Sequence, residues 1–163
     1  MKISEISRGK KRLFLYILLG IIIAYIGYQM ISHYTAEEKA SVSLNFSASE
    51  TNIVTKVTAD YTMKQGTGKL ELSKDFSDAS SLPKGCVSSF AALSTTEGEA
   101  ITKVVLTFEY DEKYLSGDET KLVAVRLSND LKEFYPAKTT VDTKNNTVTV
   151  KTSGEGKWCL AMQ

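Results

Sequence analysis

The sequence predicts a mainly β protein, in which a single N-terminal transmembrane α-helix is followed by an extracytoplasmic β-sandwich. Two observations predict this fold class. A nearly uninterrupted apolar run over 13–32 follows a basic cluster, and the chain after residue 40 alternates between apolar and polar residues in short segments separated by turn signals. An apolar run of about 20 residues crosses a bilayer as a helix, and period-two alternation is typical of strands with one buried face.

The charge around the apolar run predicts its orientation. The first twelve residues carry five basic side chains and one acidic side chain, whereas acidic and basic residues are mixed after the run. Basic flanks stay in the cytoplasm. We therefore expect 1–12 to be a cytoplasmic tail, 13–32 to be the transmembrane helix, 33–40 to be a linker and 41–163 to be the extracytoplasmic domain. A cleavable signal peptide is the alternative, but its apolar region is shorter, about 7–15 residues, and ends at small residues that are missing here.

Small residues recur along the predicted helix. Gly20, Ala24 and Gly27 are spaced by four and three residues, so they share one helix face. A face of small residues lets a second helix approach closely, which predicts helix packing and self-association. Small residues are also common in membrane helices that do not associate, and this alternative stays open.

The domain after the linker is predicted to contain many short strands. The segments with strand patterns are 42–46, 53–61, 69–72, 101–110, 121–127, 139–141, 147–151 and 157–162. Segment 101–110 alternates without interruption and is expected to be a central strand. Segment 121–127 is apolar on both faces apart from Lys121 and Arg126, which predicts an internal strand. Short strands with turns between them favour a β-sandwich, with an open barrel as the alternative.

Part of this pattern resembles a known class of module. The stretch Val-Val-Leu-Thr-Phe-Glu-Tyr-Asp at 104–111, the strand at 122–127 and the hairpin Thr-Val-Asp-Thr-Lys-Asn-Asn-Thr-Val-Thr at 140–149 resemble β-sandwich modules of bacterial and archaeal surface proteins. The resemblance is confined to the C-terminal half, and it implies a structural or adhesive unit without catalytic residues. The chain departs from these modules at 157–160, where Lys-Trp-Cys-Leu replaces the usual serine and aromatic residue.

Two cysteines and two glycosylation patterns lie outside the predicted membrane span. Cys86 and Cys159 are predicted to form a disulfide, because thiols outside the cytoplasm are readily oxidised. Two separate buried thiols are the alternative, and two cysteines alone do not supply a zinc site. Asn145 lies in a predicted hairpin turn and is the better glycosylation candidate, whereas Asn45 falls within a predicted strand.

The sequence predicts no catalytic residues, no metal and no cofactor. The single histidine, His33, falls at the membrane edge. The segments 81–84, 128–130 and 151–154 echo the motifs of penicillin-binding enzymes, but they lack the helix that carries the serine in those enzymes. Four acids could bind calcium or form an ordinary solvated turn. They surround one predicted loop: Asp111, Glu112, Asp118 and Glu119.

The expected function is surface binding or cell-envelope structure by a membrane-anchored β-sandwich. Loops near 82–89 and 114–120 are candidate contact sites, because binding residues are often carried on loops of a rigid scaffold. The expected partners are the lipid bilayer, a protein or glycan ligand at the cell surface and a second copy of the helix. Nucleic acid is not expected, because the region after the span is slightly acidic. One alternative is a subunit of a membrane-associated assembly or pilin-like filament, packed through its helix, and another is an extracytoplasmic enzyme.

Overall fold

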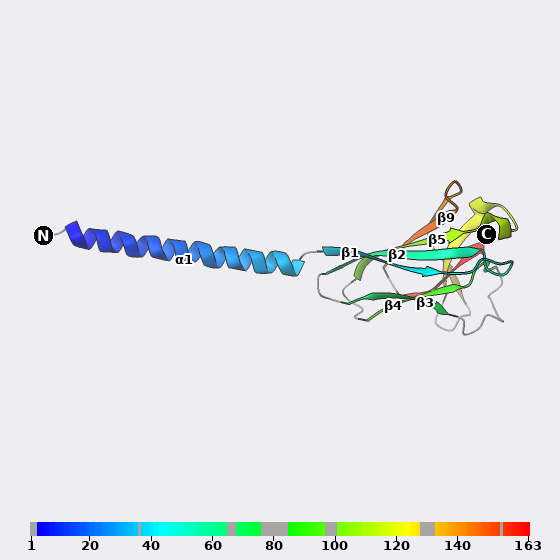
Figure 1. Ribbon diagram of the computed structural model, residues 1–163, viewed down its shortest axis with the longest axis horizontal. Coiled ribbons are helices and arrows are strands. Elements are labelled where there is room, and N and C mark those ends of the chain that lie inside the picture. Colours follow the sequence, from blue (N-terminus) through cyan, green and yellow to red (C-terminus); the bar gives the residue numbers. More distant parts are fainter. Residues whose placement is uncertain are drawn as a thin grey trace. The chain divides into compact units, whose positions relative to one another are not determined.

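The computed structural model describes residues 3–35, 37–64, 68–75, 85–96, 101–127, 133–153 and 155–163. The chain divides into two compact units, Met1–Ala36 and Glu37–Gln163. The first unit is helical and the second is built from strands (Figure 1).

The first unit is one long helix, α1 (Ile3–Thr35). Its segment Arg12–Ser32 has a mean hydropathy of 2.0, and none of this segment is buried inside the structure. It is therefore long and apolar enough to span a membrane. The helix begins within the expected tail, because the positions of basic residues mark the end of a membrane span but not the end of a helix.

The linker expected over 33–40 is wrong in its bounds. The helix continues to Thr35, and the first strand, β1 (Glu37–Asn45), begins two residues later. The first four residues of β1 pair with the end of β2 (Val54–Lys64) through the backbone. Backbone pairing needs no apolar side chains, so the exposed polar start of β1 gave no alternation signal.

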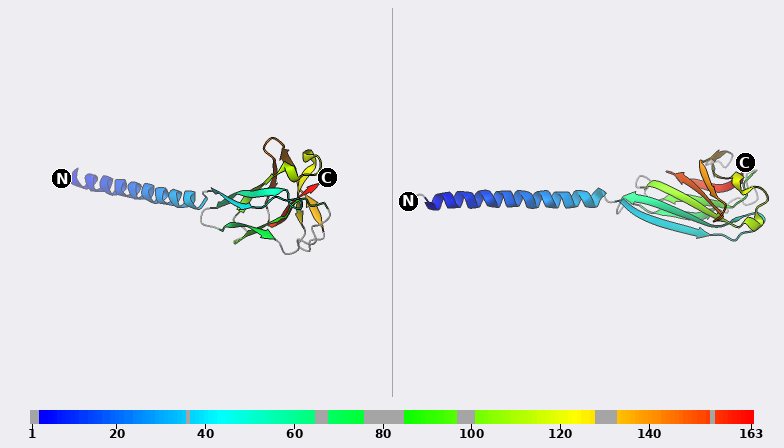
Figure 2. Two further views of the ribbon diagram at one scale, coloured as in Figure 1. Left: turned by 45° about the vertical axis from the view of Figure 1, so that its right-hand side comes forward. Right: turned by 90° about the horizontal axis from the view of Figure 1, so that it is seen from above.

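The second unit is a β-sandwich, as the sequence predicts, and it consists of two five-stranded antiparallel sheets. The remaining strands are β3 (Leu70–Asp75), β4 (Phe90–Thr95), β5 (Ile101–Tyr110), β6 (Leu122–Leu127), β7 (Phe134–Pro136), β8 (Thr139–Asp142), β9 (Thr147–Thr152) and β10 (Gly156–Met162). One sheet has the order β1-β2-β5-β9-β8, and the other has the order β3-β4-β10-β6-β7. Figure 2 shows the two layers from further directions.

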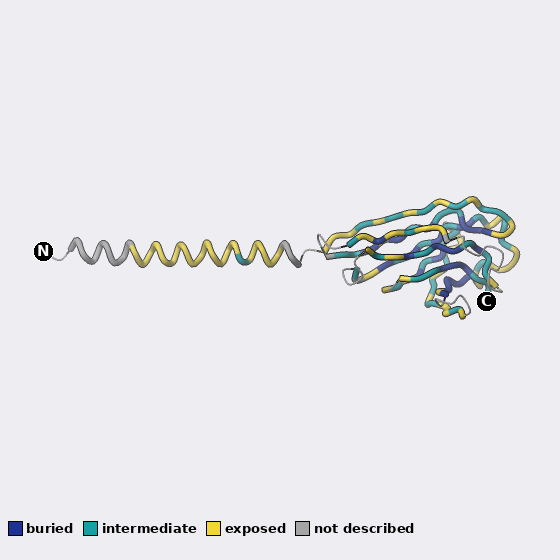
Figure 3. Tube along the Cα trace, turned by 90° about the horizontal axis from the view of Figure 1, so that it is seen from below, coloured by how far each residue is buried: buried dark blue, intermediate teal, exposed yellow. Residues whose placement is uncertain are grey.

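The main core lies between the sheets and contains the inward side chains of both. Leu106 and Phe108 from β5 are fully buried there, together with Leu160 from β10. A second apolar cluster includes Val123 and Val125 of β6, whose alternate residues belong to the main core. Both faces of β6 are therefore covered, as predicted for this strand. Figure 3 shows the buried residues concentrated along the strands, while the described side chains of α1 are mostly exposed.

One end of the sandwich is held together by buried polar contacts and a disulfide. The Ser88 hydroxyl is fully buried and accepts a hydrogen bond of 2.8 Å from the backbone N–H of Leu160. Nearby, Cys86 and Cys159 form a disulfide with their Cα atoms 6.4 Å apart, the pairing that the sequence predicts. Asn52, which is 6% exposed, joins the same end through its side-chain amide. We call this region, formed by 46–55 and 85–90, the closed end.

Candidate ligand-binding cleft

A cleft of about 810 Å³ lies between the two sheets. Its lining comes from β5 and β9 of one sheet and from the segments of β6, β7 and β10 that face them. The pairing of β8 with β9 stops at Val150, and β7 has only three residues. The cleft lies where these edge strands end, and its size is within the range of small-ligand sites, roughly 300–1,000 Å³.

Three side chains from neighbouring strands form a row across one wall of the cleft. Arg126 of β6 pairs directly with Tyr135 of β7 on one side and with Trp158 of β10 on the other. Directly paired residues on antiparallel strands point to the same face of a sheet. Ala124 and Leu122 lie on the same face of β6 as Arg126, because they are two and four residues away along the strand. Both lie in the main core, so the row faces the space between the sheets. We call Tyr135, Arg126 and Trp158 the cleft row.

Arg126 is the exception in its strand. It is exposed, whereas the other five residues of β6 are buried. Within the described chain, its guanidinium has no hydrogen bond or ion pair, and the structure's ion pair joins Lys56 to Glu109 instead. A guanidinium presents five N–H donors in a planar fork that matches a carboxylate. Arg126 therefore offers unused donors to the cleft.

Trp158 adds a second unused donor. It is 3% exposed and lines the cleft. Its indole Nε1–H is buried and finds no hydrogen-bond partner among the described residues. A buried tryptophan N–H is normally paired, and an unpaired buried donor costs about 1–3 kcal/mol. An orphan of this kind in a cleft wall indicates a site that an acceptor can complete.

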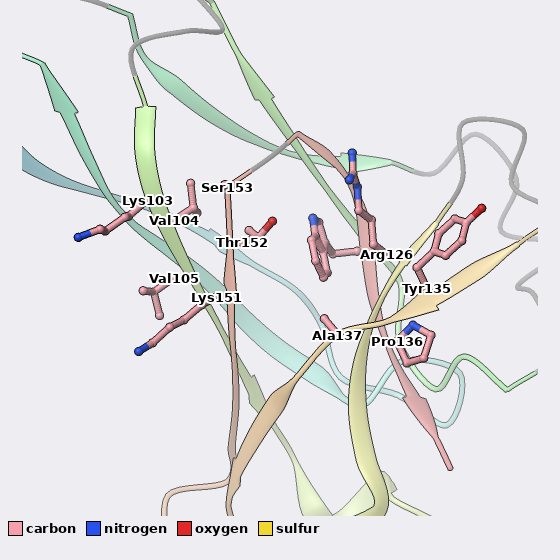
Figure 4. Close-up of a pocket in the computed structure, with 11 residues that line it drawn as sticks. Lys103, Val104, Val105, Arg126, Tyr135, Pro136, Ala137, Lys151, Thr152 and Ser153 are labelled. Carbon is pink, nitrogen blue, oxygen red and sulfur yellow. The ribbon is translucent and has the colours of Figure 1, made fainter.

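The two lysines of the cleft lining extend away from the row. Figure 4 shows Lys103 and Lys151 on one side of β5 and β9, and Thr152 and Arg126 on the other. The hydroxyls of Thr152 and Ser153 also line the cleft. Among the described lining residues there is no aspartate, glutamate, asparagine or glutamine, so the charged side chains of this wall are all cationic donors, while its hydroxyls can both donate and accept.

A smaller cavity of about 340 Å³ shares Arg126 and Ser153 with the cleft and includes Glu155. The Glu155 carboxylate accepts hydrogen bonds from the Thr95 hydroxyl and, at 2.9 Å, from the Thr95 backbone N–H. These bonds hold the pKa of Glu155 below its usual range. Glu155 is therefore directed at β4 and makes no ion pair with Arg126.

Three of the four acids that could bind calcium, Asp111, Asp118 and Glu119, have other partners. Asp111 and Asp118 accept hydrogen bonds from backbone N–H groups two residues further on and cap two short 3-10 helices. Glu119 accepts a hydrogen bond of 2.7 Å from the Tyr110 hydroxyl. Burial, followed by this hydrogen bond, raises the pKa of Tyr110. No group of three or more potential metal ligands occurs in the part of the chain that the structure describes.

The remaining predicted site residues lie outside the cleft. A Cβ atom built on Gly20 or on Gly27 would meet nothing within 4 Å. The helix-packing face of Gly20, Ala24 and Gly27 stays a prediction. Asn145 lies at the exposed tip of the β8–β9 hairpin, where its side chain donates to Asp142 at 2.7 Å. Its glycosylation likewise stays a prediction.

The two expected contact loops have structural roles where they are described. Residues 85–89 belong to the closed end. In 114–120, Tyr114 and Leu115 pack against the main core. Positions 81–84 and 128–130 lie outside the described residues, as does the side chain of His33.

Sequence reasoning missed the cleft row. Its one local signal was Arg126, a charged residue within an otherwise apolar strand. The pairing of Arg126 with Trp158 depends on the order and register of β6 and β10, which local patterns do not specify.

No protein-family model matches the chain, and the comparisons with curated proteins and with solved structures find no match either. Function is therefore inferred from the geometry of the cleft and from the membrane-spanning length of α1.

Proposed function

We propose that this is a single-pass membrane protein with a cytoplasmic N-terminus, whose β-sandwich lies outside the cytoplasm and acts in surface binding or cell-envelope structure. The main support is the segment Arg12–Ser32, an apolar helix that is long enough to span a membrane and follows a basic cluster. The disulfide between Cys86 and Cys159 supports an oxidising compartment for the other unit.

Binding rather than catalysis is supported by the chemistry of the cleft. Nucleophilic catalysis needs a nucleophile within hydrogen-bond reach of a base. The described lining residues include hydroxyls, from Thr152 and Ser153, but no histidine, cysteine or carboxylate to act as that base, and the two lysines that could do so extend to the other side of the strands from Thr152. The unused donors of Arg126 and Trp158 are suited to holding an acceptor.

The orientation is tested with reporter fusions to the C-terminus in a bacterial host. Alkaline phosphatase is active only outside the cytoplasm, and green fluorescent protein expressed through the same translocation route fluoresces only inside. We expect an active phosphatase fusion and a dark fluorescent fusion. The opposite pair of results would place the β unit in the cytoplasm and contradict the proposal.

A matched pair of variants tests the reason for this orientation. Replacing Arg8, Lys10, Lys11 and Arg12 by serine removes the positive flank, and we expect a fraction of the chains to invert. The control replaces four lysines of the β unit that lie far from the span in the sequence, and it should leave the orientation unchanged. Equal behaviour of the two sets would show that the basic cluster does not set the topology.

A further inference from the structure

We infer that the cleft binds an acidic sugar unit, whose carboxylate pairs with Arg126 and supplies the acceptor that the Trp158 indole N–H lacks. The inference rests on the proposed function only in taking the protein as a binding protein, and it does not depend on the orientation in the membrane.

The first step is the charge of the ligand. Arg126 lies between Tyr135 and Trp158 in the cleft row and has no ion-pair partner in the described chain. The one acid of the adjoining cavity, Glu155, is engaged with Thr95. A carboxylate matches the fork of a guanidinium with two parallel hydrogen bonds, and such charge-assisted bonds are about twice as strong as neutral ones. The open ligand position therefore favours an anion.

The second step is the orphan donor. The Trp158 indole N–H is buried and has no partner among the residues that the structure describes, and Trp158 is the direct cross-strand neighbour of Arg126. Arg126 is exposed and carries a flexible stem, so it can move aside as a ligand enters. An oxygen that lies beside both side chains satisfies two donors at once. An acceptor that pairs with the buried donor removes the free-energy cost that the unpaired donor has in the free protein.

The third step distinguishes a sugar from a peptide. The described side chains of the cleft offer hydroxyls and cationic donors but no carboxylate or amide acceptor. Sugar hydroxyls both donate and accept hydrogen bonds, so they match hydroxyl and cationic side chains, whereas a peptide presents a series of N–H donors and finds no carboxylate or amide oxygen in this lining. The Tyr135 ring is 53% exposed at the cleft edge and offers an apolar surface to one face of a sugar ring. A pyranose uronate has all three features, and the cleft has room for one or two such units.

The test measures binding of glucuronate and of a galacturonate disaccharide to the full-length protein in lipid nanodiscs. The chain has one tryptophan, so fluorescence excited selectively at tryptophan reports on Trp158. We expect a saturable change in Trp158 fluorescence and a matching calorimetric isotherm. Glucose, which has the same ring without the carboxylate, should bind at least tenfold more weakly. An unchanged signal with both acidic sugars would overturn the inference.

Variants test the role of Arg126. Arg126→Gln should weaken glucuronate binding at least tenfold. The matched control is Lys144→Gln, which removes one positive charge from the exposed β8–β9 hairpin, outside the cleft lining, and it should change the affinity less than twofold. If Arg126→Gln does not fold, Arg126→Lys replaces it and should weaken binding by several fold, since it keeps the charge and loses the fork. Equal losses for both positions would reduce the interaction to general electrostatics and overturn the assigned site.

Two further probes separate the alternatives. Trp158→Phe keeps an aromatic ring without the N–H and should weaken binding about tenfold by calorimetry, the effect of one hydrogen bond to a charged group. A peptide with a free C-terminal carboxylate should bind at least tenfold more weakly than glucuronate. Tighter binding of the peptide would overturn the choice of a sugar and favour a protein ligand. A failure of all these probes would leave the result of the reporter fusions, and thus the proposed topology, unaffected.

Discussion

Replacing Asn52 by alanine should destabilise the β unit by about 3–4 kcal/mol, because one buried side chain holds four hydrogen bonds at the closed end. The side-chain amide donates to the carbonyl oxygens of Ser47 and Val54, both at 3.0 Å. Its Oδ1 accepts from the backbone N–H groups of Ser89, at 3.0 Å, and Val54, at 3.3 Å. The residue thus joins the 46–55 segment to the start of β4.

The magnitude follows from which groups lose their partners. The two bonds to Val54 are buried, and this residue is only 1% exposed. Each buried group left unpaired costs about 1–3 kcal/mol. The bonds to Ser47 and Ser89 are partly buried, so water can replace them in part. Two penalties of about 1.5 kcal/mol each, with a small addition from the other two bonds, give the expected loss of about 3–4 kcal/mol.

The assay is urea unfolding of the full-length protein in detergent, followed by the fluorescence of Trp158, which reports on the β unit. The control is Ser49→Ala, which removes an exposed hydroxyl bonded to Thr51 and should cost less than about 0.5 kcal/mol. A loss for Asn52→Ala of less than about 1 kcal/mol would refute the view that this amide organises the closed end.

Three other changes have defined outcomes. Replacing Cys86 and Cys159 by alanine removes a cross-link between positions separated by 73 residues and should lower the free energy of unfolding by about 4 kcal/mol, measured as a lower urea midpoint; an unchanged midpoint would exclude a stabilising disulfide. Tyr110→Phe removes the hydrogen bond to Glu119. Because Glu119 is half-buried, its carboxylate can bind water instead, so urea titration should show a free energy of unfolding lower by about 1–2 kcal/mol. The pKa of Asp142 lies below its usual value, mainly because its carboxylate accepts a hydrogen bond from the side-chain amide of Asn145. A carboxyl group with a lower pKa in the folded state contributes stability above its unfolded pKa and loses it as the pH falls through the folded pKa. Urea midpoints should therefore fall less steeply with acid in Asp142→Asn than in the wild type, and parallel curves would contradict this assignment.

Strands with one buried face were predictable from the sequence. The prediction of 101–110 matches β5, because Val104, Leu106, Phe108 and Tyr110 alternate with residues on the outer face. The strand β4 was missed, since Phe90 and Ala91 are buried on opposite faces and its six residues give no clear period of two. The strand β7 has only three residues, too few to establish a period.

The cleft was less predictable than the strands that form it. The disulfide could be predicted from two residues and a compartment, because cysteines have few alternatives outside the cytoplasm. The cleft row needs Tyr135, Arg126 and Trp158 to meet across three strands, and this depends on two registers at once. A slip of one residue in either pairing would turn a member of the row to the opposite face of the sheet.

The closed end and the cleft follow opposite rules for buried polar groups, and the difference indicates which of them is functional. At the closed end, Asn52 and Ser88 are buried and fully engaged with the backbone, as expected where the only requirement is stability. At the cleft, Trp158 is equally buried, but its indole N–H has no partner among the described residues, and its neighbour Arg126 is exposed and makes no ion pair with any of them. Phenylalanine at position 158 would fill the core without an unpaired donor. Stability accounts for the paired groups of the closed end, and binding an acceptor accounts for the unpaired donor in the cleft wall.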